Sequence, residues 1–371
     1  MRVLILAERL GGAGGTERYL ETLIAGLRAR GDDVLAVGRE QLGWADEHAE
    51  PSMRAATEAV AIVREFAPDV AIAENVMDAA VVEALRSARQ LTYHVHDHRP
   101  FCPNGDRVFP HSQRNCTLPL GAACVVNSAV NGCAYGPRPK TLELIRARRR
   151  LRDAIRRADR ILVASRYVAD RATASGIPRA LIATVPIPLP GEAYAAAVTP
   201  SNERAIMFAG RVVPQKGLAA LVRALATIAP GARPRLRVLG EGPALQEAIA
   251  LAGRLGVTLE TRGSVGPAEV RAALDQAALL ALPSLWAEPF GSIGIEAFAR
   301  GRPVVAFAAG GIGDWLHDGI NGLAVRPRDE RGFGAAISRI LDDAALRARL
   351  GAQARQDAET FRIGNLLERL V

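Results

Sequence analysis

Short continuous apolar runs alternate with longer amphipathic stretches along almost the whole chain, and this alternation limits the folds open to it. The run RVLILA at 2–7 has no polar residue after its first, which is typical of a strand buried on both faces. The stretch 16–31 that follows carries apolar residues at helical spacing and ends at Gly31. Because strands that alternate with helices form βαβ units, the pattern predicts parallel sheets covered by helices.

The same alternation continues to residue 360. Further strands are predicted at 33–38, 69–74, 91–96, 160–165, 182–186, 204–210, 235–240, 257–263, 279–284, 303–307 and 322–327. Further helices are predicted at 52–66, 78–89, 141–158, 166–175, 217–228, 243–255, 267–277, 292–300, 329–342 and 344–360.

A proline-rich connector at 185–203 divides these elements into two sets, and 371 residues exceed the usual size of one domain. We therefore predict an α/β protein with two Rossmann-like, doubly wound domains. The first covers 1–190 and the second 191–355, with a last segment at 356–371. Residues 99–140 are rich in Pro, Gly, Asn and Cys, and are predicted to be a long irregular insertion in the first domain.

The composition suits a globular protein, with 49% hydrophobic and 23% charged residues. A net charge of +8 favours acidic ligands, namely phosphates, anionic lipid headgroups or nucleic acid. The first ten residues have too few apolar side chains for a signal peptide, and no apolar run approaches the length of a membrane span. These features lead us to expect a cytoplasmic, reducing location.

A glycine-rich turn, GGAGGTE at 11–17, follows the first strand and opens a helix. Ligands of open α/β sheets bind beyond the carboxyl ends of strands, where a helix start favours anions. Gly15 is therefore a candidate for donor binding, although a tight turn that serves only packing explains the glycines equally well. The turn matches neither G-x-G-x-x-G nor a P-loop.

The loop FAGRVVPQKGL at 208–218 has the same placement in the second domain. Arg211 and Lys216 lie five residues apart beyond a strand end, and two cations there could neutralise a diphosphate. The alternative is a pair of surface charges without a ligand.

The stretch EPFGSIGIE at 288–296 places a carboxylate at each end of a glycine-spaced helix start. Ser292 is predicted to cap the helix, and the N–H groups of Ser292, Ile293 and Gly294 to face outward as an anion site. Glu296, one turn into the helix, can accept hydrogen bonds from a vicinal diol such as a ribose. Glu288 is then available for the group beyond the phosphate.

These motifs resemble glycosyltransferase family 4. The similar segments are GGAGGTERYLETLIAGL, HVHD, FAGRVVPQKGL, LGEGP, EPFGSIGIEAFARGRPVVAFAAGGIGDWLHDGINGLAV and FRIGNLLERL. The resemblance covers nearly the whole chain and is strongest from 204 to 327. It implies a retaining enzyme of GT-B fold that uses a nucleotide sugar, with two domains that face each other across the active-site cleft. It also implies that the helix within 356–371 packs back on the first domain.

The resemblance assigns roles to individual residues of the second domain. It places Arg211 and Lys216 at the donor diphosphate, Glu296 at the ribose and Glu288 at the hydroxyls of the donor sugar. The chain departs from the family after the linker strand, where IPLPGE replaces the usual asparagine-glycine hinge.

His96 of HVHD falls at the active-site histidine of the family, and His94 and His98 lie two residues to either side. The implied reaction moves the sugar to an acceptor hydroxyl in the synthesis of a glycan, glycolipid or other glycoconjugate such as a polysaccharide. No Asp-x-Asp motif is present to hold a metal, so the expected chemistry is metal-independent, with no catalytic cofactor. Front-face attack assisted by the donor phosphate is favoured over a double displacement.

Three other functions remain open from the sequence. A nucleotide-sugar epimerase shares the fold and needs no acceptor. A non-catalytic nucleotide-sugar-binding subunit would bind the donor without turnover. A dinucleotide oxidoreductase would need the G-x-G-x-x-G that is missing.

The segment 145–160 carries eight arginines and an apolar side formed by Leu144, Ile145, Leu151 and Ile155. Such a basic amphipathic helix can lie on anionic lipid, which suggests peripheral association with the inner face of the membrane and a lipid-linked acceptor. The alternative is a solvated helix face over the core. Few aromatic residues accompany the charges, which disfavours nucleic acid as a partner.

The four cysteines, Cys102, Cys116, Cys124 and Cys133, all lie in the insertion. An irregular segment of this length needs a cross-link, and four thiolates can hold a structural Zn²⁺. An iron–sulfur cluster accepts the same ligands. The C-x2-C pairs of common zinc motifs are absent, so two disulfides or four unlinked thiols are the alternatives.

Overall fold

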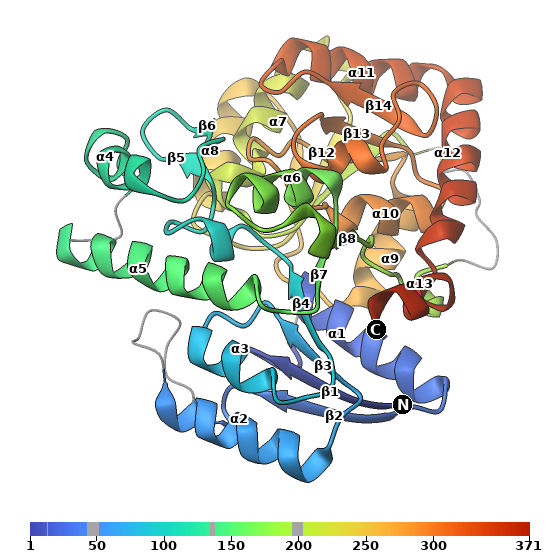
Figure 1. Ribbon diagram of the computed structural model, residues 1–371. Coiled ribbons are helices and arrows are strands. Elements are labelled where there is room, and N and C mark those ends of the chain that lie inside the picture. Colours follow the sequence, from blue (N-terminus) through green and yellow to red (C-terminus); the bar gives the residue numbers. More distant parts are fainter. Residues whose placement is uncertain (13, 43–51, 134–137, 195–202) are drawn as a thin grey trace. The chain divides into compact units, whose positions relative to one another are not determined.

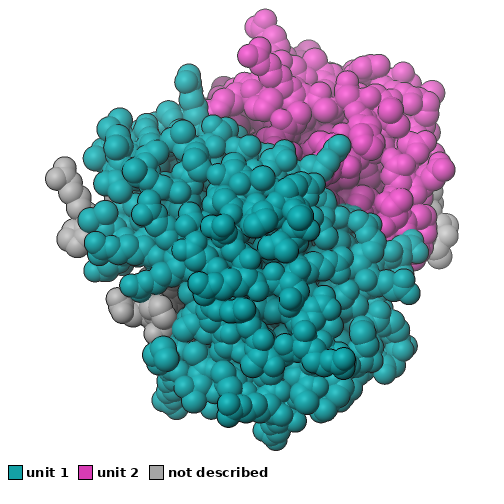
Figure 2. Space-filling view, viewed as in Figure 1, with its two compact units in different colours: residues 1–188, 363–371 teal, residues 189–362 magenta. Residues whose placement is uncertain are grey.

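A computed structural model describes residues 1–12, 14–42, 52–133, 138–194 and 203–371 of the chain. The chain forms two compact units, one of residues 1–188 with 363–371 and one of residues 189–362 (Figure 2). Each unit has its own six-stranded sheet (Figure 1). The boundaries expected from the sequence, after residues 190 and 355, lie close to these divisions.

The first unit is built on a sheet whose neighbouring strands are all parallel. The strand order is β2 (Asp33–Gly38), β1 (Arg2–Ala7), β3 (Val70–Glu74), β4 (Leu91–Val95), β7 (Arg160–Val163) and β8 (Ile182–Thr184). Its main helices are α1 (Gly15–Ala29), α2 (Met53–Phe66), α3 (Ala79–Leu85), α5 (Arg138–Ile155), α6 (Arg166–Ala174) and α13 (Ile363–Leu370).

Strand β1 explains why the predicted strands are continuous apolar runs. Leu4 and Leu6 belong to a core that includes residues of α2, α3, α5 and α6. Val3, Ile5 and Ala7 point the opposite way, into a second core with residues of α1 and α13. Because successive side chains of a strand face opposite sides of the sheet, a sheet covered on both faces needs apolar residues at every position.

The second unit repeats this plan with the strand order of a Rossmann sheet. Its parallel strands are β11 (Leu259–Thr261), β10 (Arg235–Leu239), β9 (Ala205–Ala209), β12 (Leu279–Leu282), β13 (Val304–Phe307) and β14 (Gly322–Val325). Its main helices are α7 (Leu218–Ala226), α8 (Leu245–Leu255), α9 (Pro267–Gln276), α10 (Ser292–Ala299), α11 (Glu330–Asp342) and α12 (Ala344–Ala358).

Side-chain caps fix the starts of several helices. Ser52, Asp78 and Ser165 accept hydrogen bonds from backbone N–H groups in the first turns of α2, α3 and α6. Asp329 and Asp343 do the same for α11 and α12. Each cap satisfies donors that the first turn cannot pair internally, which is worth about 1 kcal/mol.

The prediction of an α/β protein is confirmed, and every predicted strand is present with ends shifted by at most two residues. The prediction that the insertion is irregular throughout was wrong. It contains a short antiparallel hairpin of β5 (Val108–Phe109) and β6 (Arg114–Asn115), and the helix α4 (Ala122–Val130). Strands of two residues are too short to show a pattern, and α4 buries no side chain that would give it an apolar face.

Candidate functional site

The candidate site of the second unit lies at the point where the strand order reverses. Strands β9 and β12 are neighbours there, and the loops that follow them leave the sheet at its carboxyl edge. Ligands of open α/β sheets bind at such a switch point. The first loop carries Arg211 and Lys216, and the second carries Glu288, so the fold brings these three predicted residues to the same edge.

Backbone contacts hold the two loops together. The N–H of Leu285 donates to the carbonyl of Gln215 (2.8 Å). Gly217 has φ +75°, and a Cβ atom on it would lie 2.0 Å from the carbonyl oxygen of Pro283. The residue after Lys216 must therefore be glycine, because both the left-handed turn and the close approach of the second loop exclude a side chain.

Lys216 and Glu288 form a buried ion pair across these loops. Lys216 Nζ donates to Glu288 Oε1 (2.6 Å), and Ser284 Oγ donates to the same oxygen (2.5 Å). Glu288 is 3% exposed, whereas the side chain of Lys216 is 20% exposed. The ammonium group also lies 5.3 Å from the centroid of the Trp286 ring, within the range of a cation–π contact. The carboxylate therefore holds the ammonium, while part of the Lys216 side chain remains exposed.

Glu288 remains ionised in spite of its burial. Burial raises the pKa of this carboxyl, but the charge of Lys216 and hydrogen bonds from Lys216 and Ser284 outweigh it and lower the pKa below its ordinary value. Arg211 is exposed, and its guanidinium makes no ion pair with the residues that the structure describes. This edge of the sheet therefore offers one exposed cation and one half-shielded cation.

The start of α10 differs from the prediction in two respects. The cap is Gly291, with φ +83°, and no side chain accepts a hydrogen bond there, so the prediction that Ser292 caps the helix was wrong. The N–H of Gly294 donates to the carbonyl of Gly291 (2.9 Å), so it does not face outward. The backbone N–H groups of Ser292 and Ile293 are those that remain for an anion at this helix start. Glu296 lies half-buried one turn further on.

Gly294 is required by packing rather than by an anion. A Cβ atom there would lie 2.1 Å from Cη2 of Trp315, whose indole N–H donates to the carbonyl of Phe290 (2.7 Å). The indole therefore fills the space beside the helix and fixes its first turn.

The candidate site of the first unit lies at the ends of β3 and β4. Glu74 ends β3, and His94 and His96 lie at and just beyond the end of β4. His96 Nε2 is 2.5 Å from Glu74 Oε2, and Tyr19 from α1 donates to Glu74 Oε1 (3.3 Å). Tyr19 Oη is also 3.0 Å from His94 Nδ1. Glu74, His94 and Tyr19 are buried, and the side chain of His96 is 5% exposed.

The carboxylate of Glu74 is the charged centre of this group. Burial raises its pKa, but the two histidines outweigh burial and lower it to about 2. Burial lowers the pKa of His94, and its Nε2 has no hydrogen-bond partner among the described residues. We assign the proton of neutral His94 to Nδ1, which lies 3.2 Å from Glu74 Oε2, because a buried N–H without an acceptor would cost more than a buried lone pair.

Burial also distinguishes the three candidate histidines. His94 is fully buried, and His98 is 1% exposed and packs edge-on against Tyr167, at 5.8 Å between ring centroids. His96 retains the most exposure, so it is the histidine that a ligand can reach. Its ring is oriented by Glu74 through Nε2.

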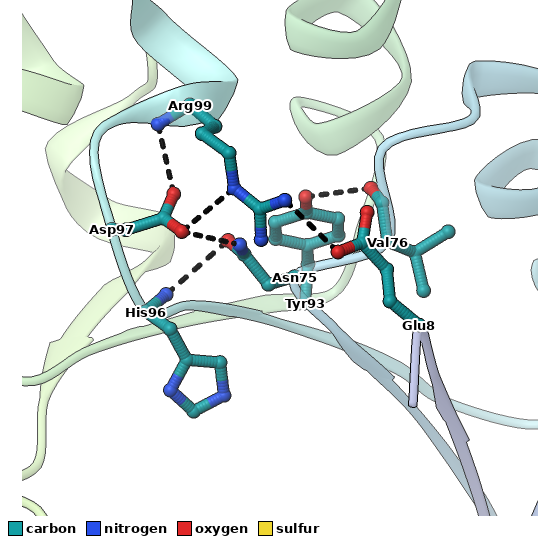
Figure 3. Close-up of polar contacts among 7 residues, drawn as sticks. All are labelled: Glu8, Asn75, Val76, Tyr93, His96, Asp97 and Arg99. Carbon is teal, nitrogen blue, oxygen red and sulfur yellow. Dashed lines mark hydrogen bonds and ion pairs between the residues drawn. The ribbon is translucent and has the colours of Figure 1, made fainter. Parts of the chain in front are cut away.

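A second polar network fixes the backbone around His96 (Figure 3). Asn75 accepts from the backbone N–H of His96 (3.3 Å) and donates to Asp97 (3.1 Å). Arg99 Nε donates to Asp97 (2.8 Å), and Arg99 Nη1 donates to Glu8 (3.0 Å) at the end of β1. The ring of His96 points away from this network.

Gly15 is the first residue of α1 and is exposed. A Cβ atom on Gly14 would lie 2.1 Å from Glu17 Oε2, so the carboxylate of Glu17 lies over this helix start. An anion that approaches the amides of the turn would meet a negative charge. The predicted role of Gly15 in donor binding therefore has less support than the predicted role of Lys216 in the second unit.

Glu74, Tyr19 and Ser284 were missed by sequence reasoning. Glu74 could have been found, because it is an acidic residue that ends an otherwise apolar strand, DVAIAE, at the carboxyl edge of the sheet. Tyr19 gave no signal beyond an apolar position of helix α1, and Ser284 none beyond a strand end.

Glu74, His94 and His96 have ligand atoms within 4.8 Å of one another, a spacing that a metal could use. The contacts between them are hydrogen bonds, however. Two ligands of tetrahedral Zn²⁺, each about 2.0–2.1 Å from the ion, lie about 3.3 Å apart. The 2.5 Å contact between His96 and Glu74 is shorter, so a shared proton fits this pair better than an ion.

The predicted amphipathic helix at 145–160 is mostly α5, and its apolar side faces the protein. Leu144, Ile145, Leu151 and Ile155 are at most 4% exposed. The prediction that they supply an apolar side for lipid was wrong, because all four are buried, and Leu151 and Ile155 belong to the core beside the sheet. Exposed arginines remain on the opposite side, at 146, 149, 150, 156 and 157. Within the described part of the chain, no helix has the length and apolar character needed to cross a membrane.

Two family models match the chain. The model described as "Glycosyl transferase 4-like domain" matches residues 14–188, and the one described as "Glycosyl transferases group 1" matches residues 193–357. A curated D-inositol 3-phosphate glycosyltransferase from Nocardioides sp. is 36% identical over 182 residues, which cover 44% of this chain and 39% of that protein. A glycogen synthase from Mycobacterium tuberculosis is 35% identical over 156 residues, which cover 41% of this chain and 37% of that protein. The chain thus spans about two fifths of the length of these relatives.

Solved structures match over the full chain. Anabaena HepE in complex with UDP aligns with a TM-score of 0.73 and 19% identity, over 100% of this chain and 98% of that one. Sucrose-phosphate synthase from Thermosynechococcus elongatus aligns with a TM-score of 0.72 and 18% identity, over 100% and 97%. These likenesses, together with the two sheets, confirm the predicted GT-B class of two-domain α/β fold.

Proposed function

The chain belongs to the glycosyltransferases of the family 4 type, and from this premise we propose that it moves a sugar from a nucleotide diphosphate sugar to an acceptor hydroxyl with retention of configuration. The observation that carries the proposal is the Lys216–Glu288 pair at the switch point of the second sheet, with exposed Arg211 on the same loop. A diphosphate needs cations at a strand end, and this edge of the sheet provides them.

The leaving diphosphate gains negative charge as the sugar becomes oxocarbenium-like. Arg211 and Lys216 are proposed to stabilise that charge, together with the amides of Ser292 and Ile293. Two cations can fill the role that a divalent ion has in other transferases, so the proposed chemistry is metal-independent.

Glu288 is proposed to act in two ways. Its carboxylate orients the ammonium of Lys216 toward the diphosphate, a role that its burial and ionised state support. It also accepts hydrogen bonds from hydroxyls of the donor sugar. Glu296, one turn into α10, is proposed to accept from the ribose hydroxyls.

His96 is proposed to hydrogen-bond a donor-sugar hydroxyl or to orient the acceptor. Because Nε2 is held by Glu74, the other ring nitrogen, Nδ1, is the atom left for substrate. None of the described residues is assigned as a carboxylate nucleophile, and we favour front-face attack in which a donor phosphate oxygen takes the acceptor proton.

UDP and UDP-glucose occur in the names of the HepE complexes, so uridine nucleotides are the first donors to test. The acceptor is proposed to be a polyol, a growing glycan or a lipid-linked glycan. A D-inositol 3-phosphate glycosyltransferase is among the relatives, which supports the inclusion of phosphorylated polyols.

Contact with an anionic membrane surface at the inner face is proposed on a different basis from the amphipathic helix expected at first. Helix α4, which contacts α5, exposes Val125, Val126 and Val130. Exposed valines on α4 and exposed arginines on α5, including Arg149 and Arg150, would combine shallow apolar insertion with attraction to anionic headgroups.

A thermal-shift screen against nucleoside diphosphates and their sugars tests the donor proposal, because binding raises the melting temperature. Turnover is then followed as release of nucleoside diphosphate that depends on an added acceptor, and NMR of the product reads the anomeric configuration. An altered donor sugar without acceptor would indicate an epimerase instead. Binding without release under any acceptor would indicate a non-catalytic subunit.

A further inference from the structure

The insertion at 99–140 buries few apolar side chains, among them Phe101, Val108 and Leu120. Its helix α4 buries none of its side chains, and Val125, Val126 and Val130 are 42%, 62% and 65% exposed. Its strands β5 and β6 pair only two residues each. Fixing the backbone of each residue costs conformational entropy, which burial of apolar surface normally offsets. A segment with so little apolar burial therefore needs another source of stability, such as a cross-link.

The four cysteines of the chain lie where the parts of this segment join. Cys102 follows the 3-10 helix that ends at Phe101, and Cys116 follows β6. The N–H of Cys116 donates to the carbonyl of Arg107 (2.6 Å), which closes the hairpin on the side of Cys102. Cys124 lies in the first turn of α4, and the N–H of Cys133 donates to a carbonyl inside the same helix (3.4 Å).

Cys102 lies in a turn that leads to Arg107. The N–H of Gly105 donates to the carbonyl of Cys102 (3.0 Å). Arg107 is 2% exposed, and its guanidinium is held by the carbonyls of Cys116 (3.2 Å) and Leu118 (2.7 Å). A buried cation therefore lies beside the cysteines and can balance negative charge there.

The four side chains are free thiols, each partly buried. The N–H of His111, in the turn between β5 and β6, donates to the carbonyl of Asn131 at the end of α4 (3.3 Å). This bond joins the hairpin that precedes Cys116 to the helix end that precedes Cys133. Backbone contacts therefore link the segments that carry the four cysteines.

We propose that Cys102, Cys116, Cys124 and Cys133 bind one structural Zn²⁺ ion. Four cysteines without an oxygen or nitrogen ligand are a set that zinc prefers, in tetrahedral geometry. Binding removes the thiol protons to solvent and leaves a complex of net charge −2 beside Arg107. No three of the sulfur atoms lie within 4.8 Å of one another in the present structure, so binding requires the side chains to turn toward a common centre.

The ion would fix a segment that starts directly after the network around His96. Arg99 of that network begins the 3-10 helix that ends one residue before Cys102. Zinc would thereby connect the hairpin and α4 to the end of β4, and it would take no part in sugar transfer.

The metal content of the unmodified full-length protein, purified without chelator, tests the proposal and does not depend on the transferase activity. We expect about one equivalent of zinc per chain by elemental analysis, released when a mercurial reagent titrates four thiols. Less than about a tenth of an equivalent, with four free thiols in denaturant, would overturn the proposal. Iron in place of zinc, accompanied by visible absorption, would overturn the proposal as well. So would two disulfides.

Two variants of the same helix locate the site. Cys124→Ser should weaken zinc binding at least as much as the 10- to 100-fold known for loss of a supporting residue, and it should speed proteolysis within 99–140. Ser128→Ala is the matched control, because Ser128 is half-buried on α4, as Cys124 is, and its hydroxyl donates to the carbonyl of Val125 within that helix (2.6 Å). Equal zinc content in the two variants would refute the assignment of Cys124. Should Cys124→Ser fail to fold, competition of the unmodified protein against a chromogenic chelator still measures the affinity.

Discussion

Replacing Lys216 by methionine should separate two roles of this ammonium group, one in stability and one in donor binding. Methionine keeps the unbranched apolar stem but leaves the carboxylate of Glu288, 3% exposed, with the hydroxyl of Ser284 as its hydrogen-bond donor. Loss of one partner from a fully buried pair costs about 3–5 kcal/mol, and an exposed pair contributes at most about 1 kcal/mol. Because the side chain of Lys216 is 20% exposed, we expect the free energy of unfolding at pH 7 to fall by about 2–3 kcal/mol.

The effect should depend on pH with a definite sign. In the unmodified protein the pKa of Glu288 is lowered, so its contribution to stability is complete above the ordinary value of 4.5 and is lost as the pH falls through the lowered value. In Lys216→Met burial is no longer opposed by the ammonium, so the pKa of Glu288 should rise above 4.5. The folded variant then holds a proton that the unfolded chain has released, and its stability falls as the pH rises. The difference between the two proteins should therefore grow from pH 4 to pH 7.

Urea unfolding at several pH values and calorimetric binding of a nucleoside diphosphate provide the two measurements. The double variant Lys216→Met/Glu288→Gln should regain stability, since no buried charge remains, yet both variants should bind the diphosphate about 10- to 150-fold more weakly. Arg223→Met is the control, because it breaks a more exposed pair with Glu330 in the same unit. The reasoning fails if Lys216→Met is no less stable than this control, or if the double variant binds the diphosphate normally.

Three further outcomes are expected. Glu296→Ala should weaken donor binding about 10- to 150-fold with an unchanged melting temperature, and calorimetry with near-normal affinity would contradict its ribose role. Glu74→Gln should lower kcat more than donor affinity, because it frees the ring of His96. It should also remove the part of the stability that the protein loses between pH 4.5 and about 2. An acid unfolding curve like that of the unmodified protein would contradict this. Arg149→Glu with Arg150→Glu should reduce flotation with anionic vesicles and leave binding to neutral ones unchanged; equal flotation of variant and parent would reject the membrane surface.

The two sheets could be predicted from the sequence because their signal is local. Strands such as 2–7 and 279–284 are apolar at nearly every position, and glycine or proline marks their ends. The hairpin and α4 of the insertion could not be predicted in this way. The strands pair only two residues each, and α4 has no buried face that would require apolar residues at a regular spacing.

Contacts between distant residues were the part of the site that the sequence did not reveal. Glu288 was predicted to lie in a loop, yet it is buried. Its carboxylate accepts hydrogen bonds from Lys216, 72 positions earlier, and from Ser284. The apolar side of α5 posed the opposite problem. Its spacing fits a membrane surface or a protein core equally well, and only the packing of Leu151 and Ile155 decides between them.

The return of α13 to the first unit has a consequence for how the protein is made. Leu366, Leu367 and Leu370 complete the core that covers Val3 and Ile5 of β1. During translation that face of the first sheet lacks part of its cover until α13 leaves the ribosome, about 180 residues after β8. At 5–20 residues per second this is a delay of roughly 10–40 s. A nascent chain with an uncovered apolar face for that long is a candidate client for ribosome-associated chaperones, and truncation before Ile363 should shift newly made protein from the soluble to the aggregated fraction.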